Sequence, residues 1–331
     1  MKILMFDFRE SEKDYFEKND LKDFDITFIK SPLNEKSELT PEQLEETTVI
    51  SVFTTSNLTE DVLKRFKNLR MVATRSTAFS HIDLNYCTNH NIAVSNVAQY
   101  GETAVAEYAI ALILMLVRYI MPADYDMKNN TVNHKKYEGR ELSSYTIGII
   151  GCGAIGSAVA RIAKFFGMEV LIHSYMKNPE LSETCNFVSL DELLEKSDII
   201  SLHIPYDGDN YHLLAENEFQ KMKDGVFIVN TARGELIDIE ALYNNLKSGK
   251  IRGAGLDVME CESLTLLQRK DETNPKCANI VNITKKLFSM SNVIITPHIA
   301  YNTYESVNYL LEATFNNIRD NLKGMSSDRV C

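Results

Sequence analysis

The sequence contains no tryptophan, only seven prolines and no apolar run long enough to cross a membrane. Its longest apolar stretch, residues 104–121, is interrupted by Glu107 and Arg118, whereas a membrane span needs about 20 apolar residues with few charges. This stretch therefore predicts a buried helix that stops at Pro122. The first seven residues have a strand pattern that is too short and too acidic for a signal peptide, so we expect a cytoplasmic protein.

Cysteine motifs and basic runs are missing as well. The six cysteines form no C-x-x-C pair, and no cysteine–histidine group has the spacing of a zinc site. We therefore expect no metal, and free thiols in a reducing compartment. The 35 lysines and arginines are outnumbered by 46 acidic residues, which gives a net charge of −11. Such a chain has little attraction for nucleic acid or for an anionic membrane surface.

The chain does contain two series of alternating strand-like and helical segments. Its 331 residues suffice for two domains, and the alternation predicts an α/β fold of parallel sheets covered by helices. The expected strands are 3–8, 26–29, 49–54, 71–74, 92–96, 146–150, 169–173, 199–204, 226–230, 253–257 and 293–296. The expected helices are 11–18, 40–46, 61–66, 83–89, 101–121, 156–166, 191–196, 240–248 and 304–322, with an irregular segment at 263–292.

A glycine turn in the second series gives the strongest single signal. An apolar strand ends in Gly151-x-Gly153-x-x-Gly156, and an alanine-rich helical pattern follows. Gly151 permits the tight turn, Gly153 lets a pyrophosphate approach the backbone, and Gly156 lets the helix pack close to the strand. Free N–H groups at the helix start face the phosphates. The segment therefore predicts a dinucleotide site.

Three later strands end in polar segments, at 229–234, 256–262 and 295–300. Each polar residue alone has an ordinary structural explanation, such as a helix cap or a satisfied buried histidine. Together they supply what hydride transfer to a ketone needs. Arg233 is a planar cation that fits a carboxylate, and His298 is a suitable acid for the carbonyl oxygen. A carboxylate beside that histidine would favour its protonated form, and the acids at these strand ends include Asp257 and Glu262.

The order of these motifs resembles the family of D-isomer-specific 2-hydroxyacid dehydrogenases, most closely its D-lactate dehydrogenase branch. The resemblance runs through segments 75–77, 96–98, 151–156, 202–205, 230–234 and 296–300, and so covers nearly the whole chain. It implies two doubly wound, Rossmann-like parallel-sheet domains with a cleft between them. The substrate domain would comprise 1–99 and 300–331, and the dinucleotide domain 100–299. A helix and arm at 101–142 would join two copies in a homodimer.

The resemblance also implies roles for particular residues. Arg233 would grip the substrate, His298 would be the acid and base, and Glu262 would orient His298. The expected cofactor contacts are Gly151, Gly153, Ala154, Ile155, Gly156, Ser174, His203, Pro205, Thr231, Ala232, Asp257, His298 and Ala300. The expected substrate contacts are the backbone N–H groups of Thr77 and Ala78, with Arg233, and the pocket walls Phe53, Tyr100 and Tyr301.

Two departures from the family pattern concern the ligands. Ala78 stands where many members have glycine, and its methyl group would tighten the carboxylate site. At the end of strand 169–173, where an acid usually holds the ribose 2′-hydroxyl, this chain has Ser174. NADP is therefore not repelled, and His173 or Lys177 is a candidate to hold its phosphate. The resemblance favours NAD.

We therefore expect an oxidoreductase that reduces a small 2-keto acid to the D-2-hydroxy acid. Two alternatives remain open at the level of sequence. One is a glyoxylate/hydroxypyruvate or phosphoglycerate-type dehydrogenase, although no added basic residues are evident for a phosphorylated substrate. The other is a nucleotide-sensing binding protein on the same fold, which the joint presence of Arg233, Glu262 and His298 disfavours.

Overall fold

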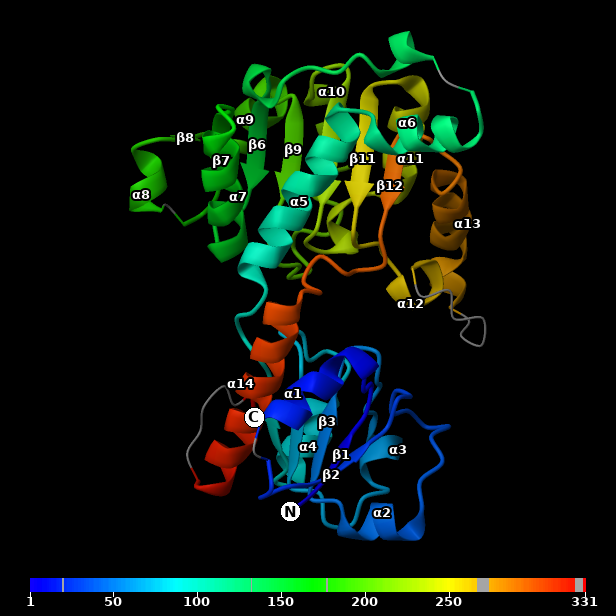
Figure 1. Ribbon diagram of the computed structural model, residues 1–331, viewed down its shortest axis with the longest axis vertical. Coiled ribbons are helices and arrows are strands. Elements are labelled where there is room, and N and C mark those ends of the chain that lie inside the picture. Colours follow the sequence, from blue (N-terminus) through cyan, green and yellow to red (C-terminus); the bar gives the residue numbers. More distant parts are fainter. Residues whose placement is uncertain (20, 132, 177, 267–273, 325–329) are drawn as a thin grey trace. The chain divides into compact units, whose positions relative to one another are not determined.

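The computed structural model describes residues 1–19, 21–131, 133–176, 178–266, 274–324 and 330–331. The chain forms two compact units, Met1–Gly101 with Asn302–Cys331, and Glu102–Tyr301. Each unit is α/β, and the strand and helix elements are drawn in Figure 1.

The smaller unit contains, among its described residues, a five-stranded parallel sheet in the order β2-β1-β3-β4-β5. Its strands are β1 (Lys2–Met5), β2 (Asp25–Phe28), β3 (Val49–Val52), β4 (Met71–Thr74) and β5 (Ala93–Ser95). Every residue of β3 and β4 is buried, because helices cover both faces of the sheet. The strands lie within two residues of the predicted positions, except that β1 ends three residues earlier than the expected strand 3–8.

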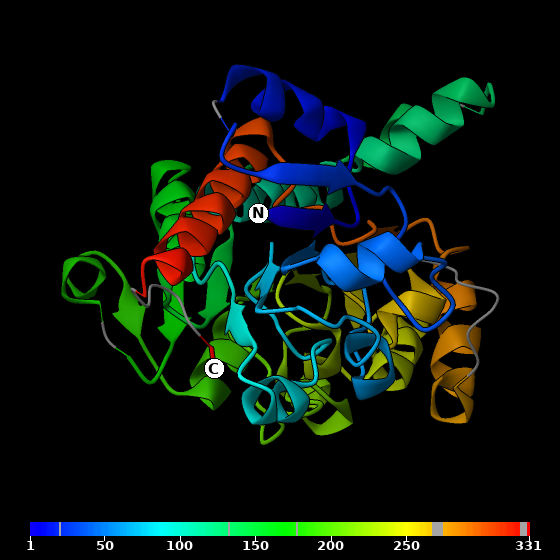
Figure 2. The same ribbon diagram turned by 90° about the horizontal axis from the view of Figure 1, so that it is seen from below.

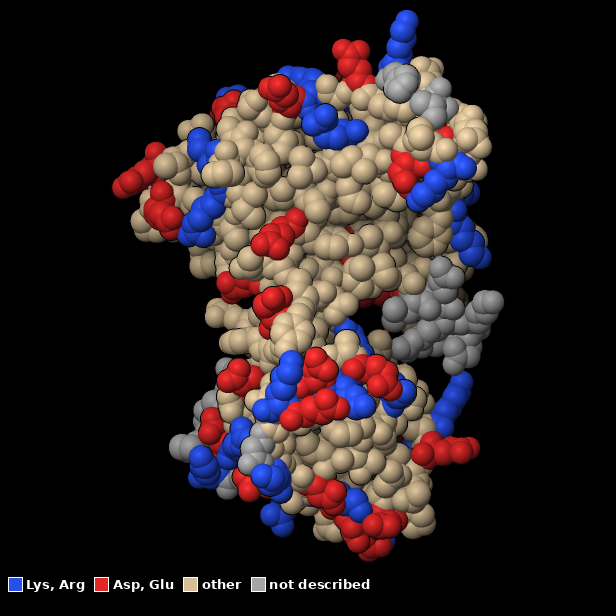
Figure 3. All heavy atoms as spheres, in the orientation of Figure 1, with Lys and Arg blue, Asp and Glu red and all other residues tan. Residues whose placement is uncertain are grey.

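Helices divide between the two faces of this sheet. Aromatic and aliphatic residues of α1 (Lys13–Lys18) and α14 (Tyr304–Leu322) pack with β1, β3 and β4, and Figures 1 and 2 show these two helices side by side. On the other face lie α2 (Pro41–Glu46), α3 (Glu60–Leu63) and α4 (Leu84–Asn89). Caps fix several helix starts: Thr40 forms a capping box with Gln43, and Thr303 accepts a hydrogen bond from the backbone of Ser306. Acidic and basic side chains are interspersed on the face of this unit seen in Figure 3.

The larger unit has a parallel sheet whose described strands follow the order β12-β11-β10-β9-β6-β7-β8. They are β6 (Thr146–Ile150), β7 (Glu169–His173), β8 (Asn186–Phe187), β9 (Ile199–Leu202), β10 (Val226–Asn230), β11 (Ile251–Leu256) and β12 (Val293–Ile295). The strand order reverses between β6 and β9, which makes their carboxyl ends the switch point of a doubly wound fold. This geometry places the glycine turn after β6 at that point.

Two sets of helices cover the faces of the larger sheet. The long helix α5 (Glu102–Val117) and α7 (Ala154–Phe165) pack on one face, as Figure 1 shows for α5. The other face carries α9 (Leu190–Lys196), α10 (Glu216–Lys221), α11 (Ile239–Ser248) and α13 (Ala278–Leu287). The short helix α8 (Pro179–Ser182) follows β7. The sequence analysis did not foresee β8, α10 or α13.

The prediction of one helix over 101–121 is wrong. Helix α5 ends at Val117, and a separate helix, α6 (Ile120–Lys128), begins after Tyr119, whose φ is 53°. Pro122 lies in the first turn of α6, where the absence of its N–H costs no intrahelical hydrogen bond. Within the described residues no single helix qualifies as a membrane span; α5 and α6 would qualify only as a pair, bent by 60°.

The segment 263–292 also differs from expectation, since it is not irregular throughout. A short helix, α12 (Glu262–Thr265), opens it, and α13 packs its buried face on the sheet; residues 267–273 of this segment lie outside the described part. The expectation that all cysteines are free is wrong too, because Cys261 and Cys277 form a disulfide. The pair has no C-x-x-C spacing, so only folding reveals it; Cys87, Cys152, Cys185 and Cys331 are not disulfide-bonded.

Candidate active site

The glycine turn has the form that a dinucleotide requires. Gly151 has a φ of 99°, and a Cβ at this residue would lie 2.4 Å from the carbonyl oxygen of His203. A Cβ at Gly156 would lie 2.0 Å from the carbonyl oxygen of Gly151. Gly153, at the start of α7, has nothing within 4 Å of that position. Two of the glycines therefore close the strand–helix packing, and the third leaves space in front of the turn, next to Ala154 and Ile155.

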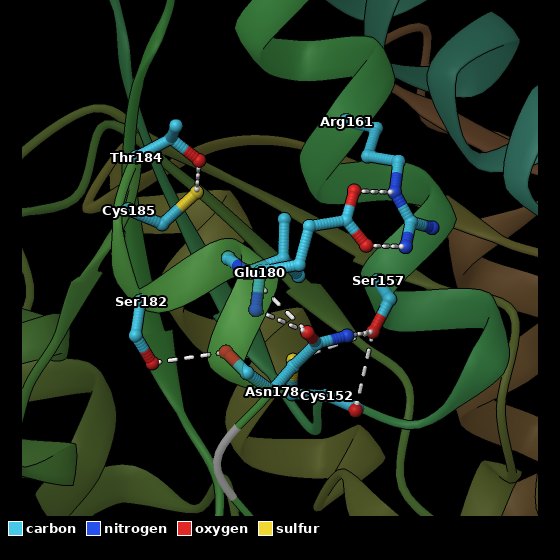
Figure 4. Close-up of polar contacts among 9 residues, drawn as sticks. Cys152, Ser157, Arg161, Asn178, Glu180, Ser182, Thr184 and Cys185 are labelled. Atoms are coloured by element: carbon cyan, nitrogen blue, oxygen red, sulfur yellow. Dashed lines mark hydrogen bonds and ion pairs between the residues drawn. The ribbon is translucent and has the colours of Figure 1, made fainter.

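The segment after β7 is tied to α7 by polar contacts, shown in Figure 4. Asn178 caps α8 and donates a hydrogen bond to Ser157 Oγ at 3.3 Å, and Arg161 grips Glu180 through two nitrogens at 3.1 and 2.6 Å. Ser174, at the end of β7, accepts a hydrogen bond from the backbone N–H of Met176. Position 174 thus presents a hydroxyl group and no charge, while Lys177 lies outside the described residues.

The loops after β9 and β10 carry four of the predicted cofactor residues. His203 Nε2 lies 2.8 Å from Ser201 Oγ, and burial lowers the pKa of this histidine to about 4, so it is neutral. The carbonyl oxygen of Pro205 is held by Asn210. Thr231 Oγ1 is buried and, among the described residues, has no hydrogen-bond partner. Together with the open space at Gly153, this orphaned hydroxyl fits a polar ligand such as a dinucleotide.

Buried Asp257 organises the loop that carries the histidine. Its carboxylate accepts hydrogen bonds from Thr296 Oγ1 at 2.5 Å and from the backbone N–H groups of Ile299 and Ala300 at 3.0 and 2.8 Å. Burial raises the pKa of Asp257, and these hydrogen bonds oppose the shift. The backbone carbonyl of Asp257 also accepts from His298 N–H at 2.9 Å. Asp257 therefore fixes the backbone on both sides of the histidine.

His298 and Glu262 form a direct pair. His298 Nδ1 lies 2.9 Å from the Glu262 carboxylate, with side chains 37% and 35% exposed, respectively. The carboxylate fixes the tautomer with the proton on Nδ1, which leaves Nε2 for a ligand. His298 has a φ of 54°, a conformation that costs a residue with a side chain about 1 kcal/mol or more. Such strain persists where the surrounding structure enforces it.

The arginine belongs to the neighbouring strand end. Arg233 is half-buried, and its Nη1 donates a hydrogen bond to the carbonyl oxygen of Ala232 at 2.6 Å. Asn230 holds the same loop, bonding the Ala232 N–H and the Arg233 carbonyl. A Cβ on Gly234 would lie 2.0 Å from the backbone of Met259, so the arginine loop packs directly on the segment leading to Glu262.

The remaining predicted residues divide between the two units. In the smaller unit, Thr77 donates to the Val97 carbonyl, its own carbonyl is held by Asn96, and Ser76 Oγ donates to the carbonyl of Ala78. Phe53 donates its N–H to Asp7 and stacks with Arg9, and Tyr100 is half-buried. Tyr301 is buried at the end of the larger unit, next to buried Ala300.

Sequence reasoning missed several polar residues of these loops. Thr296 joins Asp257 to Tyr108 of α5, and Asp7, at a φ of 56°, gathers Phe53, Thr55 and Ser56. Residues of these types are common at strand ends, so the sequence does not single them out. Only Thr296 could have been noticed, because it precedes Pro297 in the segment that leads to the histidine. Among the described residues, no group of three or more histidine, cysteine or acidic side chains could hold a metal ion.

Comparisons with known proteins agree with this architecture. Residues 110–300 match the model of the D-isomer specific 2-hydroxyacid dehydrogenase NAD binding domain. A 2-hydroxyacid dehydrogenase homolog from Haemophilus influenzae is 36% identical over 100% of this chain and 98% of its own. An aromatic 2-oxoacid reductase from Clostridium sporogenes is 37% identical over 85% of this chain and 86% of its own.

Solved structures are similar along the whole chain. The crystal structure of D-lactate dehydrogenase from Aquifex aeolicus, complexed with NAD and lactic acid, is 36% identical with a TM-score of 0.82, covering 97% of this chain and 96% of that one. The fold, the glycine turn and these matches all indicate the same family. The chain belongs to the D-isomer-specific 2-hydroxyacid dehydrogenases, NAD-dependent oxidoreductases that act on CH–OH donors.

Proposed function

We propose that the protein reduces a small 2-keto acid, of the size of pyruvate, to the D-2-hydroxy acid, with His298 as the proton donor. The observation that carries this proposal is the hydrogen-bonded pair of Glu262 and His298, in which His298 lies on a loop fixed by buried Asp257. The similar enzyme from Aquifex aeolicus, described with NAD and lactic acid, supports the substrate size. The described residues of the site include no added basic cluster of the kind that a phosphorylated substrate would need.

In this proposal each side chain has one task. Arg233 binds the substrate carboxylate, since a guanidinium fits that group through two parallel hydrogen bonds. Glu262 stabilises the protonated ring of His298 and orients it, so that Nε2 delivers a proton to the carbonyl oxygen during reduction and takes it back during oxidation. The nicotinamide, when bound, supplies or accepts the hydride at the carbon.

The cofactor would lie along the carboxyl ends of β6, β9 and β10. Gly151, Gly153, Ala154, Ile155 and Gly156 form the turn that would receive the pyrophosphate. Ser174 would face the ribose, and the other expected contacts are His203, Pro205, Thr231, Ala232, Asp257, His298 and Ala300. From the smaller unit, Thr77 and Ala78 would bind the substrate carboxylate, with Phe53 and Tyr100, as well as Tyr301 of the larger unit, as pocket walls.

One assay tests the activity. The purified protein is mixed with NADH and, in turn, pyruvate, 2-ketoisocaproate, phenylpyruvate, hydroxypyruvate or glyoxylate, and the nicotinamide absorbance is followed. We expect the highest kcat/KM with pyruvate or another short 2-keto acid, and a D-configured product. A preference for phenylpyruvate would instead match the Clostridium sporogenes reductase. Binding of NADH without turnover of any of the five would support a nucleotide-sensing protein.

We further propose that α5 and α6 join two copies in a homodimer. Helix α6 has no buried residue within one chain, and it exposes Ile120, Met121, Tyr125 and Met127 by 48, 46, 67 and 61%. Exposed apolar clusters of this kind are typical of interfaces. Light scattering should give the mass of a dimer, and Tyr125→Asp with Met127→Asp should shift it toward the monomer. An unchanged mass would place the contact elsewhere.

A further inference from the structure

The Cys261–Cys277 disulfide lies directly beside the residues of the proposed acid pair. Cys261 immediately precedes Glu262 and is the N-cap residue of α12, with a φ of 56°. Glu262 in turn holds His298 at 2.9 Å. A covalent bond to Cys277 thus fixes the backbone one residue before a carboxylate whose position decides how His298 is oriented.

A cavity of about 710 Å³ opens onto this disulfide. Its lining includes Tyr211, Glu235, Glu260, Cys261 and Cys277, all in the larger unit. Both cysteines line it, with Cys261 half-buried and Cys277 5% exposed. The cavity therefore gives a small molecule a route to the disulfide, and Cys261 is the more exposed of its two residues.

The wall of this cavity is acidic. Glu235 and Glu260 line it, and the described lining residues include no lysine or arginine. Glu260 also lies 3.3 Å from His212 Nε2 and accepts a hydrogen bond from Tyr211, so its carboxylate is held in place. The carboxylates of Glu235 and Glu260 repel anions and favour neutral or cationic molecules.

From these observations we propose that Cys261 and Cys277 are a thiol-reactive pair, which neutral or cationic thiols reach through this cavity. The redox state of the pair sets the position of Glu262. The link to catalysis rests on the proposed function of Glu262 and His298; the thiol chemistry does not.

The exchange is balanced with a thiol as the reductant. A thiolate attacks Cys261 Sγ, the S–S bond breaks, and Cys277 leaves as a thiolate that takes up a proton. A second thiol attacks the mixed disulfide, releases Cys261 and forms the disulfide of the reductant. Two electrons and two protons pass to the cysteines, and two thiol groups become one disulfide.

Thiol titration tests the pair without any enzyme assay. The full-length protein, isolated in air without added thiol, should give four thiols after unfolding, from Cys87, Cys152, Cys185 and Cys331, and six after reduction. Six thiols before reduction would overturn the proposal.

Reduction rates test the acidic route. The rate constants for cysteamine, 2-mercaptoethanol and 3-mercaptopropionate are each corrected for the thiolate fraction and for the lower nucleophilicity of a thiolate whose thiol pKa is lower. The corrected constants should fall in that order, because the attacking thiolates become more negative, with a ratio between the first and the last on the order of tenfold at low ionic strength. Glu235→Gln should reduce the ratio of the cysteamine rate constant to the 3-mercaptopropionate rate constant, because one negative charge is removed from the cavity wall. Equal constants would contradict access through this cavity.

The effect on Glu262 is read at His298. The ring proton resonance of His298 is identified by its loss in His298→Gln, and its chemical shift should differ between the oxidised and the reduced protein. The value of kcat/KM should fall about tenfold on reduction, which is less than the loss that a misplacement of about 1 Å can cause. Both effects should vanish in the double variant Cys261→Ser with Cys277→Ser and persist in Cys331→Ser. A resonance that does not move would overturn the coupling, whether or not the protein turns over a 2-keto acid.

Discussion

Glu262 accepts a hydrogen bond at 2.9 Å from Nδ1 of His298, and the two residues are brought together from loops after neighbouring parallel strands. We expect His298→Gln to lower kcat/KM by a factor on the order of 10² or more, because the general acid is lost. Glu262→Gln should have a smaller effect, about tenfold, together with an altered pH–rate profile. His90→Gln is the control, since His90 is exposed and contacts Tyr86 in the smaller unit. Normal turnover in His298→Gln would refute the assignment.

Arg233 is predicted to bind the substrate carboxylate with two nitrogens. Arg233→Ala should reduce kcat/KM on the order of 10²-fold or more, and Arg233→Lys should recover only part of the loss, because an ammonium group cannot form the planar double contact. Steady-state kinetics with NADH separate KM from kcat. Arg161→Lys, which changes the exposed pair with Glu180, serves as the matched control. Full recovery by lysine would mean that charge alone is required.

Ser174 presents a hydroxyl where a carboxylate would repel a 2′-phosphate. Ser174→Asp should therefore raise KM for NADPH far more than KM for NADH. Glu183→Gln, an exposed change in the same region, should alter neither. Equal effects of Ser174→Asp on both cofactors would place the ribose elsewhere.

The stability of each unit should fall in mild acid. Burial lowers the pKa of His81 in the smaller unit and of His203 in the larger unit to about 4, from an ordinary value of 6.5. As the pH falls below 6.5, the unfolded chain takes up these protons first, so the stability contributed by the neutral rings is present above 6.5 and is lost between 6.5 and 4. Thermal unfolding at pH 7, 6 and 5 measures the expected decrease in Tm.

Replacement of each histidine by glutamine removes the titrating group. His81→Gln and His203→Gln should each reduce the acid dependence of Tm, and His90→Gln should leave it unchanged. An acid dependence that survives both substitutions would show that other groups are responsible.

Much of the fold follows from patterns that are local in sequence. Strands such as β6, β7 and β10 are apolar runs bounded by polar residues, and Gly151 and Gly156 occupy positions where a side chain would clash. The hydrogen-bonded pair of Glu262 and His298 was also expected. The remaining features depend on contacts between distant residues. No local pattern shows that Tyr119 breaks a helix, that Thr296 meets Asp257, or that Cys277 reaches Cys261.

Two side-chain-bearing residues of the site, Cys261 and His298, adopt left-handed backbone conformations with φ of 56° and 54°. Glycine would adopt these conformations more cheaply, by about 1 kcal/mol for each residue. At position 298, selection for thermal stability alone would favour glycine, and the imidazole would be lost. At position 261 the disulfide, worth about 3 kcal/mol for a loop of this length, outweighs what glycine would gain. The most stable version of this chain and the most active one are therefore different sequences, and a search for hardier variants should leave these two positions unchanged.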